Sequence, residues 1–154
     1  MMKKLMLMAV IALGVSVAAN AQPRAIGARL GWGFEASYQH TVKNADFVEL
    51  DLGLFTHSVN LNAIYDFMIA QPNWTSRGEW GFYAGPGASI GFGVLGDDDG
   101  NFNIAVAGQV GLEYTFWFPL QLSFDIKAQL GGGLGHDPGF YWGVGPALSV
   151  RYRF

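Results

Sequence analysis

Hydrophobic and polar residues alternate with a period of two along most of this chain. The clearest example is residues 140–154, where every even position is apolar or aromatic and the odd positions up to Arg153 are small, hydroxylated or cationic. Successive side chains of a β-strand point to opposite faces. This segment therefore predicts a strand with one apolar face and one polar face, ending at Phe154.

The same alternation recurs in seven other segments, separated by runs rich in Gly, Pro, Asn and Asp. The predicted strands are residues 24–32, 34–40, 47–55, 58–70, 79–94, 102–116, 120–130 and 140–154. One long strand over residues 24–40 would keep the same parity. We predict two strands joined by Gly-Trp-Gly at 31–33, because about 9 to 11 residues are enough for a strand to span a membrane.

The loops follow from the same pattern, and two prolines lie inside predicted strands. Residues 71–77, 96–101, 117–119 and 131–139 are predicted loops. Because proline has no N–H to donate to a ladder, an interruption of strand pairing is expected at Pro86 and at Pro146. The sequence predicts an all-β fold: one domain, residues 22–154, forming an eight-stranded antiparallel up-and-down transmembrane β-barrel.

Residues 1–21 are predicted to be a cleaved signal peptide. Lys3 and Lys4 form a basic start, residues 5–19 are apolar, and Ala19-Asn20-Ala21 provides small residues for signal peptidase. The apolar run is shorter than the about 20 residues that an anchoring helix needs. Since the chain has no cysteine, disulfides, cysteine-ligated metals and a lipoprotein anchor are all excluded.

Composition favours a membrane barrel over a soluble barrel with an apolar interior. Charged residues make up 14% of the chain, against about 25% in a typical soluble domain. The polar strand faces are mostly Gly, Ser, Ala, Asn and Gln, which fit the narrow interior of an eight-stranded tube. Aromatic residues fall at both ends of the predicted strands, as two interfacial girdles require. One girdle comprises Tyr38, Tyr65, Phe67, Trp80, Phe82, Tyr114, Phe116, Tyr152 and Phe154, and the other Trp32, Phe34, Phe92, Phe102, Phe140 and Trp142.

The chain resembles the small eight-stranded outer-membrane proteins related to the OmpX and OmpA barrels, in the compact form common among Bacteroides-type bacteria. The resemblance rests on the alternating strands and the ending Arg151-Tyr-Arg-Phe154. It implies location in the cell outer membrane and a monomer in contact with outer-membrane lipid and lipopolysaccharide. It also implies that Tyr152 and Phe154 form a signal read by the barrel-assembly machinery. The short predicted loops differ from those of relatives with adhesive or invasion roles.

Several charged residues lie on the face predicted to point inward. They are Arg29, Glu35, Glu49, Asp51, Asp66, Glu113, Asp125, Lys127, Arg151 and Arg153. Buried charges are costly unless they are paired and hydrogen-bonded. We therefore expect the cations to meet carboxylates across or around the lumen, with Gln109, Gln121 and Tyr83 satisfying the remaining groups. Such an interior is filled and has no continuous pore.

Candidate chemistry is sparse. The glycine-rich segment at 85–91 lacks the Lys-Ser/Thr of a phosphate loop, and its glycines are expected to make room for facing side chains. Asp97, Asp98 and Asp99 are weak candidates for a divalent cation, without the spacing of an EF-hand.

The enzymatic alternative is a lipid A deacylase or acyltransferase, which would need a nucleophile beside a histidine base. His57 and Ser58 are adjacent and would point to opposite faces of a strand, although His136-Asp137 could approach Ser58 from the last loop. We predict a non-catalytic barrel with a structural or surface-binding role, with no cofactor and no nucleic-acid partner.

Overall fold

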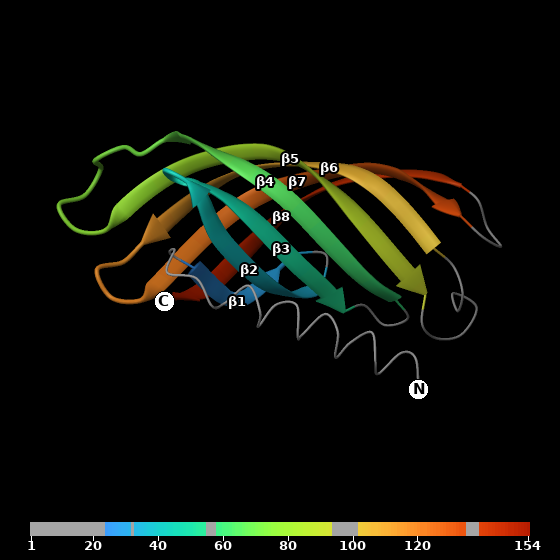
Figure 1. The fold of residues 1–154 in the computed structure, drawn as a ribbon, viewed down its shortest axis with the longest axis horizontal. Helices are drawn as coiled ribbons and strands as arrows, with labels where there is room; N and C mark the ends of the chain where they lie inside the picture. Colours follow the sequence, from blue (N-terminus) through green and yellow to red (C-terminus); the bar gives the residue numbers. More distant parts are fainter. Residues whose placement is uncertain (1–23, 32, 55–57, 94–101, 135–138) are drawn as a thin grey trace.

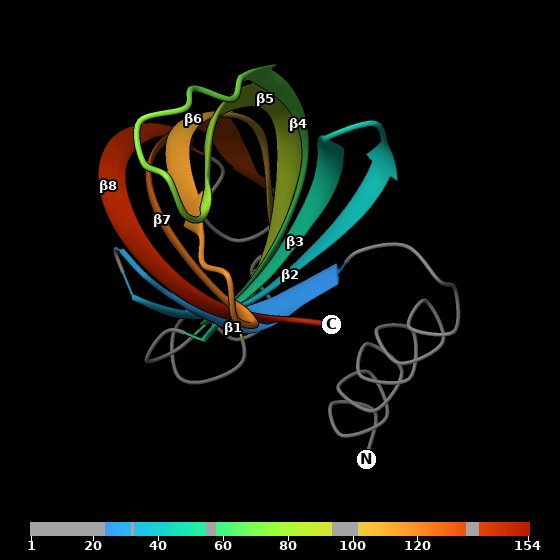
Figure 2. The same ribbon diagram turned by 90° about the vertical axis from the view of Figure 1, so that its left-hand side faces the viewer.

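The computed structural model describes residues 24–31, 33–54, 58–93, 102–134 and 139–154. The predicted signal peptide lies outside these ranges. Eight strands form a closed antiparallel barrel in sequence order, as predicted (Figures 1 and 2). They are β1 (Arg24–Leu30), β2 (Phe34–Lys43), β3 (Asp46–Leu54), β4 (Ser58–Ala70), β5 (Glu79–Gly93), β6 (Phe102–Thr115), β7 (Leu120–Leu134) and β8 (Phe140–Arg153). No helix in the described part of the chain is long and apolar enough to cross a membrane.

The first and last strands close the barrel. Arg24 and Phe154 exchange both of their backbone hydrogen bonds, at 3.1 and 2.9 Å, and the register continues from Ala25↔Arg153 to Leu30↔Leu148. We call the end of the barrel at Arg24 and Phe154 the near end, and the opposite end the far end. The turns from β2 to β3, β4 to β5 and β6 to β7 all lie at the near end.

The first hairpin consists of two strands, which confirms the choice made from the sequence. Leu30 pairs with Phe34, and the Gly31 N–H donates to the Gly33 carbonyl at 3.1 Å. A short turn is possible here because the residues that flank it, Gly31 and Gly33, have no side chains that could clash. The predicted near-end turn at 117–119 is also present, where the Leu120 N–H donates to the Phe118 carbonyl at 2.6 Å.

The barrel wall has unequal height. Strands β1 to β3 contain 7, 10 and 9 residues, whereas β4 to β8 contain 13 to 15. Pairing between β1 and β8 ends at Leu148, although β8 starts at Phe140. Residues 140–147 of β8 therefore extend beyond their described pairing with β1, and the tall wall projects past the low wall at the far end (Figure 1).

Both prolines lie where strand pairing is interrupted, as expected. Between β4 and β5 the register passes from Ile64↔Gly87 to Phe67↔Ala84, so the positions opposite Gly85 and Pro86 are unpaired. Pro146 lies two residues beyond Leu148, the last residue of β8 that pairs with β1. Because even-numbered residues of β8 point their backbone groups at β1, the missing N–H of Pro146 falls beyond the described pairing of these two strands.

Two strand ends lie well beyond the prediction. β2, predicted to end at residue 40, continues to Lys43 across a register shift, with Thr41 paired to Phe47 and Lys43 to Asp46. Residues 131–134, assigned to the last loop from the sequence, continue β7, and Gly131 to Leu134 pair with Ala105 to Phe102 of β6. Three successive glycines carry no alternation of polarity, so the period of two could not reveal this part of the strand. The partner strand β6 supplies the hydrogen bonds that fix it.

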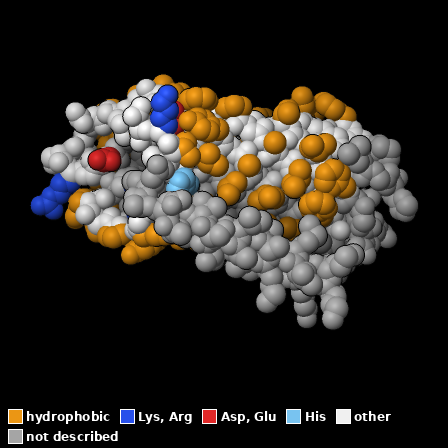
Figure 3. Space-filling model, in the orientation of Figure 1, with side chains coloured by type: hydrophobic (Ala, Val, Ile, Leu, Met, Phe, Trp, Pro, Cys, Tyr) orange, Lys and Arg blue, Asp and Glu red, His pale blue; other side chains and the backbone are white. Residues whose placement is uncertain are grey.

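Burial is inverted relative to a soluble domain. Among the described residues, eighteen polar or charged residues are buried, against seven hydrophobic ones. Large apolar side chains on the outer face are exposed, including Phe124, Ile126, Leu130, Trp142 and Leu148. On the face shown in Figure 3, apolar side chains extend along the length of the barrel, and the visible Lys, Arg, Asp and Glu gather toward the near end. Period-two alternation thus places the polar face inside and the apolar face outside.

Candidate functional site

The lumen of the barrel contains a network of charged and amide side chains at mid-height. Its members come from strands on all sides of the barrel, and each occupies an inward position of its strand. Those that are at least nine-tenths buried are Arg29, Glu35, Gln39, Glu49, Asp51, Asn62, Asp66, Gln109, Glu113, Gln121, Asp125, Lys127 and Arg151. We call this set the lumen network.

Arg29 joins three strands on the far-end side of the lumen network. Its Nη2 lies 2.5 Å from Asp125 Oδ1 and its Nε lies 3.3 Å from Asp125 Oδ2. This two-point contact reaches from β1 to β7, past the intervening β8. Arg29 Nη1 also pairs with the Glu35 carboxylate, its register neighbour on β2, and Asn62 donates to Glu35 at 3.3 Å. Bidentate pairing of this kind fixes orientation as well as charge.

Two further ion pairs cross the lumen to β3. Lys127 Nζ of β7 lies 2.9 Å from Asp51 Oδ2, and Arg151 Nη2 of β8 lies 3.1 Å from Glu49 Oε2. Arg151 also donates to the hydroxyls of Ser37 and Ser123 at 2.8 to 2.9 Å. Its donors therefore contact β2, β3 and β7. The predicted meeting of cations with carboxylates across the lumen is what the structure shows for Arg29, Lys127 and Arg151.

Amide side chains provide further hydrogen bonds to the carboxylates, including two that form no ion pair within the described chain, Asp66 and Glu113. Gln109 Nε2 lies 3.3 Å from Glu49 Oε1 and 3.1 Å from Asp66 Oδ2. Gln121 donates to Glu113 at 2.5 Å and to Gln39 at 2.9 Å. Asp66 forms no ion pair within the described chain, and its Oδ1 has no hydrogen-bond partner there. Gln109 is therefore the described hydrogen-bond donor that holds this carboxylate.

Tyr83 does not act as expected. Its side chain is fully buried, but its hydroxyl has no partner among the described residues. The ring instead packs edge-on against Phe47, with centroids 5.1 Å apart. A Cβ added at Gly111 would collide with the Tyr83 ring, so this glycine makes room for it. Within the glycine-rich segment 85–91, a Cβ added at Gly91 would meet the side chains of Asn60 and Asn103, as expected, whereas one added at Gly85 or Gly87 would first meet a backbone carbonyl of β4.

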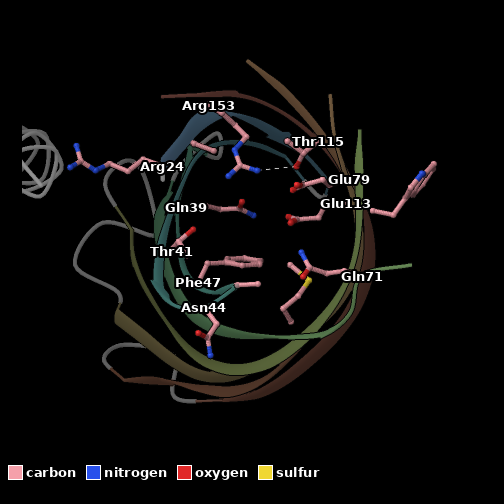
Figure 4. Close-up of a pocket in the computed structure, with 14 residues that line it drawn as sticks. Arg24, Gln39, Thr41, Asn44, Phe47, Gln71, Glu79, Glu113, Thr115 and Arg153 are labelled. Carbon is pink, nitrogen blue, oxygen red and sulfur yellow. Dashed lines mark hydrogen bonds between the residues drawn. The ribbon is translucent and has the colours of Figure 1, made fainter. Parts of the chain in front are cut away.

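Arg153 occupies a different setting from the rest of the predicted network. It lies at the near end, where its Nη1 donates to the Thr115 hydroxyl at 3.0 Å. It forms no ion pair within the described chain. A cavity of about 360 Å³ opens there, lined by residues that include Gln39, Thr41, Phe47, Met68, Gln71, Glu79, Glu113 and Arg153 (Figure 4). We call it the near-end cavity.

The near-end cavity was not predicted from the sequence, although two signals pointed to it. Phe47 and Met68 are large apolar residues at inward positions of otherwise polar strand faces. In the structure both line the near-end cavity. On the far-end side of the lumen network the hollow beside Arg29, Glu35 and Lys127 is only about 10 Å³. Mid-height side chains thus separate two unequal spaces.

The remaining candidate sites fall largely outside the described residues. These are Asp97, Asp98 and Asp99, together with His57, His136 and Asp137. Ser58 starts β4. Within the described part of the chain no group of three or more His, Asp or Glu side chains is arranged to hold a metal ion. The described histidine, His40, has its Nδ1 3.3 Å from the Tyr38 hydroxyl.

Comparisons with known proteins add nothing to this picture. No protein-family model matches the chain, and neither the curated proteins nor the solved structures searched contain a match. Function is therefore inferred from the side chains inside and outside the barrel.

Proposed function

We propose that this chain is an integral outer-membrane β-barrel with a filled interior and a non-catalytic role, either structural or in binding at the membrane surface. The observation that carries the proposal is the inverted burial: polar and charged groups are inside, and large apolar side chains cover the outside. In water such an exterior would associate, since soluble monomers rarely expose apolar patches of this extent. In a bilayer it is the surface that lipid requires.

The aromatic residues support the same proposal. At the near end a run of rings in contact extends from the β4–β5 loop to the β6–β7 turn, with centroid separations of 4.6 to 5.8 Å. It comprises Trp74, Trp80, Phe82, Tyr114, Phe116, Trp117 and Phe118. Arg77 lies over the Trp117 ring at 5.4 Å. At the far end Phe140 and Trp142 are exposed. Aromatic rings at both ends of an apolar band suit the two bilayer interfaces.

The filled interior supports a role other than transport. Carboxylates, cations and amides from opposite walls meet at mid-height, and most of their hydrogen-bonding groups are used. An eight-stranded barrel is just wide enough for side chains to fill it. Such a barrel would be a monomer, and its partners would be outer-membrane lipid and lipopolysaccharide.

Membrane fractionation tests the proposal. The full chain, expressed in a Gram-negative host, should be found with the outer membrane, resist extraction by high salt and carbonate, and require detergent for solubility. Its mobility in a denaturing gel should change on boiling, as expected of a stable closed barrel. Recovery of a monodisperse, detergent-free monomer from the soluble fraction would contradict the proposal and favour a soluble barrel.

Assembly is tested separately at the last strand. The side chains of Tyr152 and Phe154 lie exposed on the outer face of β8, with their rings stacked. The proposed recognition by the assembly machinery predicts that Phe154→Asp reduces outer-membrane levels and leaves degraded or periplasmic protein. Phe140→Asp, at the opposite end of the same strand, is the matched control. Unchanged levels of the Phe154→Asp protein would remove this residue from the assembly signal.

A further inference from the structure

The near-end cavity brings together charged groups that the rest of the barrel does not neutralise. Glu79 of β5 and Glu113 of β6 lie on neighbouring strands, two register positions apart, and both point into the cavity (Figure 4). Neither carboxylate has a cation within ion-pair distance in the described chain. Gln121 satisfies one oxygen of Glu113 at 2.5 Å. Two adjacent carboxylates therefore present a site for a positively charged group.

Two arginines belong to the lining, and they point in different directions: Arg24 points away from the cavity, whereas Arg153 points into it beside Thr115, the register partner of Glu79 (Figure 4). Arg153 of β8 extends into the cavity, and its recorded polar contact is the Thr115 hydroxyl at 3.0 Å. Guanidinium groups bind carboxylates through two parallel N–H donors. Since one hydroxyl leaves most of the guanidinium donors unused, Arg153 can still receive a carboxylate.

The floor of the cavity is apolar, and amides surround it. Phe47 is 3% exposed and lies beside Met68 in the lining, while Gln39, Thr41 and Gln71 supply neutral donors and acceptors (Figure 4). A volume of about 360 Å³ is at the small end of the ~300 to 1,000 Å³ typical of ligand pockets. The lining thus combines an anionic corner, a cationic corner and an apolar patch in a small volume.

We propose that the near-end cavity binds a small zwitterion, an α-amino acid or a short peptide, with its ammonium at Glu79 and Glu113 and its carboxylate at Arg153. An apolar side chain of the ligand would lie against Phe47 and Met68. This goes beyond the proposed barrel function, since the residues that line the cavity are the same whether or not lipid surrounds the barrel. A ligand with only one of the two charges leaves part of the site unpaired, so both charges are needed for full affinity.

Calorimetric titration of the folded full-length protein in detergent micelles with four probes tests the proposal. The probes are L-leucine, leucinamide, N-acetyl-leucine and the dipeptide leucylglycine. Leucine or leucylglycine should bind most tightly, and the stronger of the two identifies the free amino acid or the peptide as the better ligand. Leucinamide should bind at least about tenfold more weakly, the loss expected when one hydrogen-bonded charge pair is removed. N-acetyl-leucine should show the weakest binding.

Variants assign the two charged corners. Arg153→Gln should weaken leucine binding by at least about tenfold and leave leucinamide binding unchanged. The double variant Glu79→Gln/Glu113→Gln should weaken the binding of both leucine and leucinamide. Lys43→Gln, an exposed position at the same end that does not line the cavity, is the control and should change neither. Gel mobility with and without boiling establishes that each variant is folded. Failure of all four probes to bind the folded wild type, or equal loss of leucine and leucinamide in Arg153→Gln, would overturn the proposal.

Discussion

Arg151 and Arg153 lie two residues apart on the same face of β8, yet their surroundings differ completely. Arg151 is 1% exposed and contacts Ser37, Ser123 and Glu49 from three other strands. Arg153 lines a cavity and contacts one hydroxyl. Residue type and strand parity are the same for both. Position along the barrel axis therefore decides whether an inward charge is part of the structure or is available to a ligand.

The largest expected effect separates these two arginines. Arg151→Met leaves Glu49 buried without its cation, which should lower the free energy of unfolding by about 3 to 5 kcal/mol. Arg153→Met removes a partly exposed charge that forms no ion pair with the described residues, and it should cost less than about 1 kcal/mol. Urea titrations of folding into lipid vesicles would measure both. Similar losses at the two positions would show that the near end is as tightly coupled as mid-height.

The next effect compares two heights on the outer face of the barrel. Phe124 is exposed on the outer face of β7, and Phe124→Arg should destabilise by about 2 to 4 kcal/mol if it lies near the bilayer midplane. Val42→Arg, on the outer face close to the near end of β2, should cost about 1 kcal/mol or less. The same vesicle titration applies. If arginine is tolerated equally at both sites, lipid does not contact Phe124.

A smaller effect distinguishes tightly packed from open glycines on β6. Gly111→Ala forces a methyl group into the Tyr83 ring, and overpacking of this kind should cost about 1 to 3 kcal/mol. Gly108→Ala is the control, because the nearest heavy atom to its added Cβ is 4.0 Å away. An unchanged unfolding midpoint for Gly111→Ala would mean that Tyr83 can move within the lumen.

The smallest expected signal is electrical. Because the lumen network closes the barrel at mid-height, purified wild-type monomer in planar bilayers should give no reproducible single-channel conductance. Arg151→Met, which removes the contacts to Ser37, Ser123 and Glu49, is the comparison to make at the same protein concentration. Stable unitary currents from the wild type would contradict the filled interior.

The fold and the inward-facing set could be predicted from the sequence because a period of two determines both at once. Each alternating run, such as residues 120–130 of β7, reveals the presence of a strand and its two faces together. The alternation did not predict the strand at residues 131–134, because successive glycines have no polarity to alternate. It also could not show that Tyr83 would pack on Phe47 and leave its hydroxyl without a described partner.

The partners of each ion pair could not be predicted from the sequence. Alternation predicts that Arg29 points inward, and neighbouring strands explain its contact with Glu35. The contact with Asp125 depends on how far a guanidinium reaches past β8, which is a matter of barrel diameter and strand tilt. The near-end cavity depends in the same way on the sizes of side chains from several strands. Met68 stood out in the sequence as an apolar residue on a polar face, but nothing there showed that it would share a cavity with Glu79.

In the proposed membrane location, the low wall formed by β1 to β3 would have a consequence for the surrounding lipid. A bilayer of uniform thickness would meet 13 to 15 residues of strand on the β4 to β8 side but only 7 to 10 on the other. Such mismatch is relieved by tilting the protein or by thinning the bilayer locally. The barrel would accordingly lean in its membrane, with a patch of thinned, more easily disordered lipid beside Leu30 and Phe34.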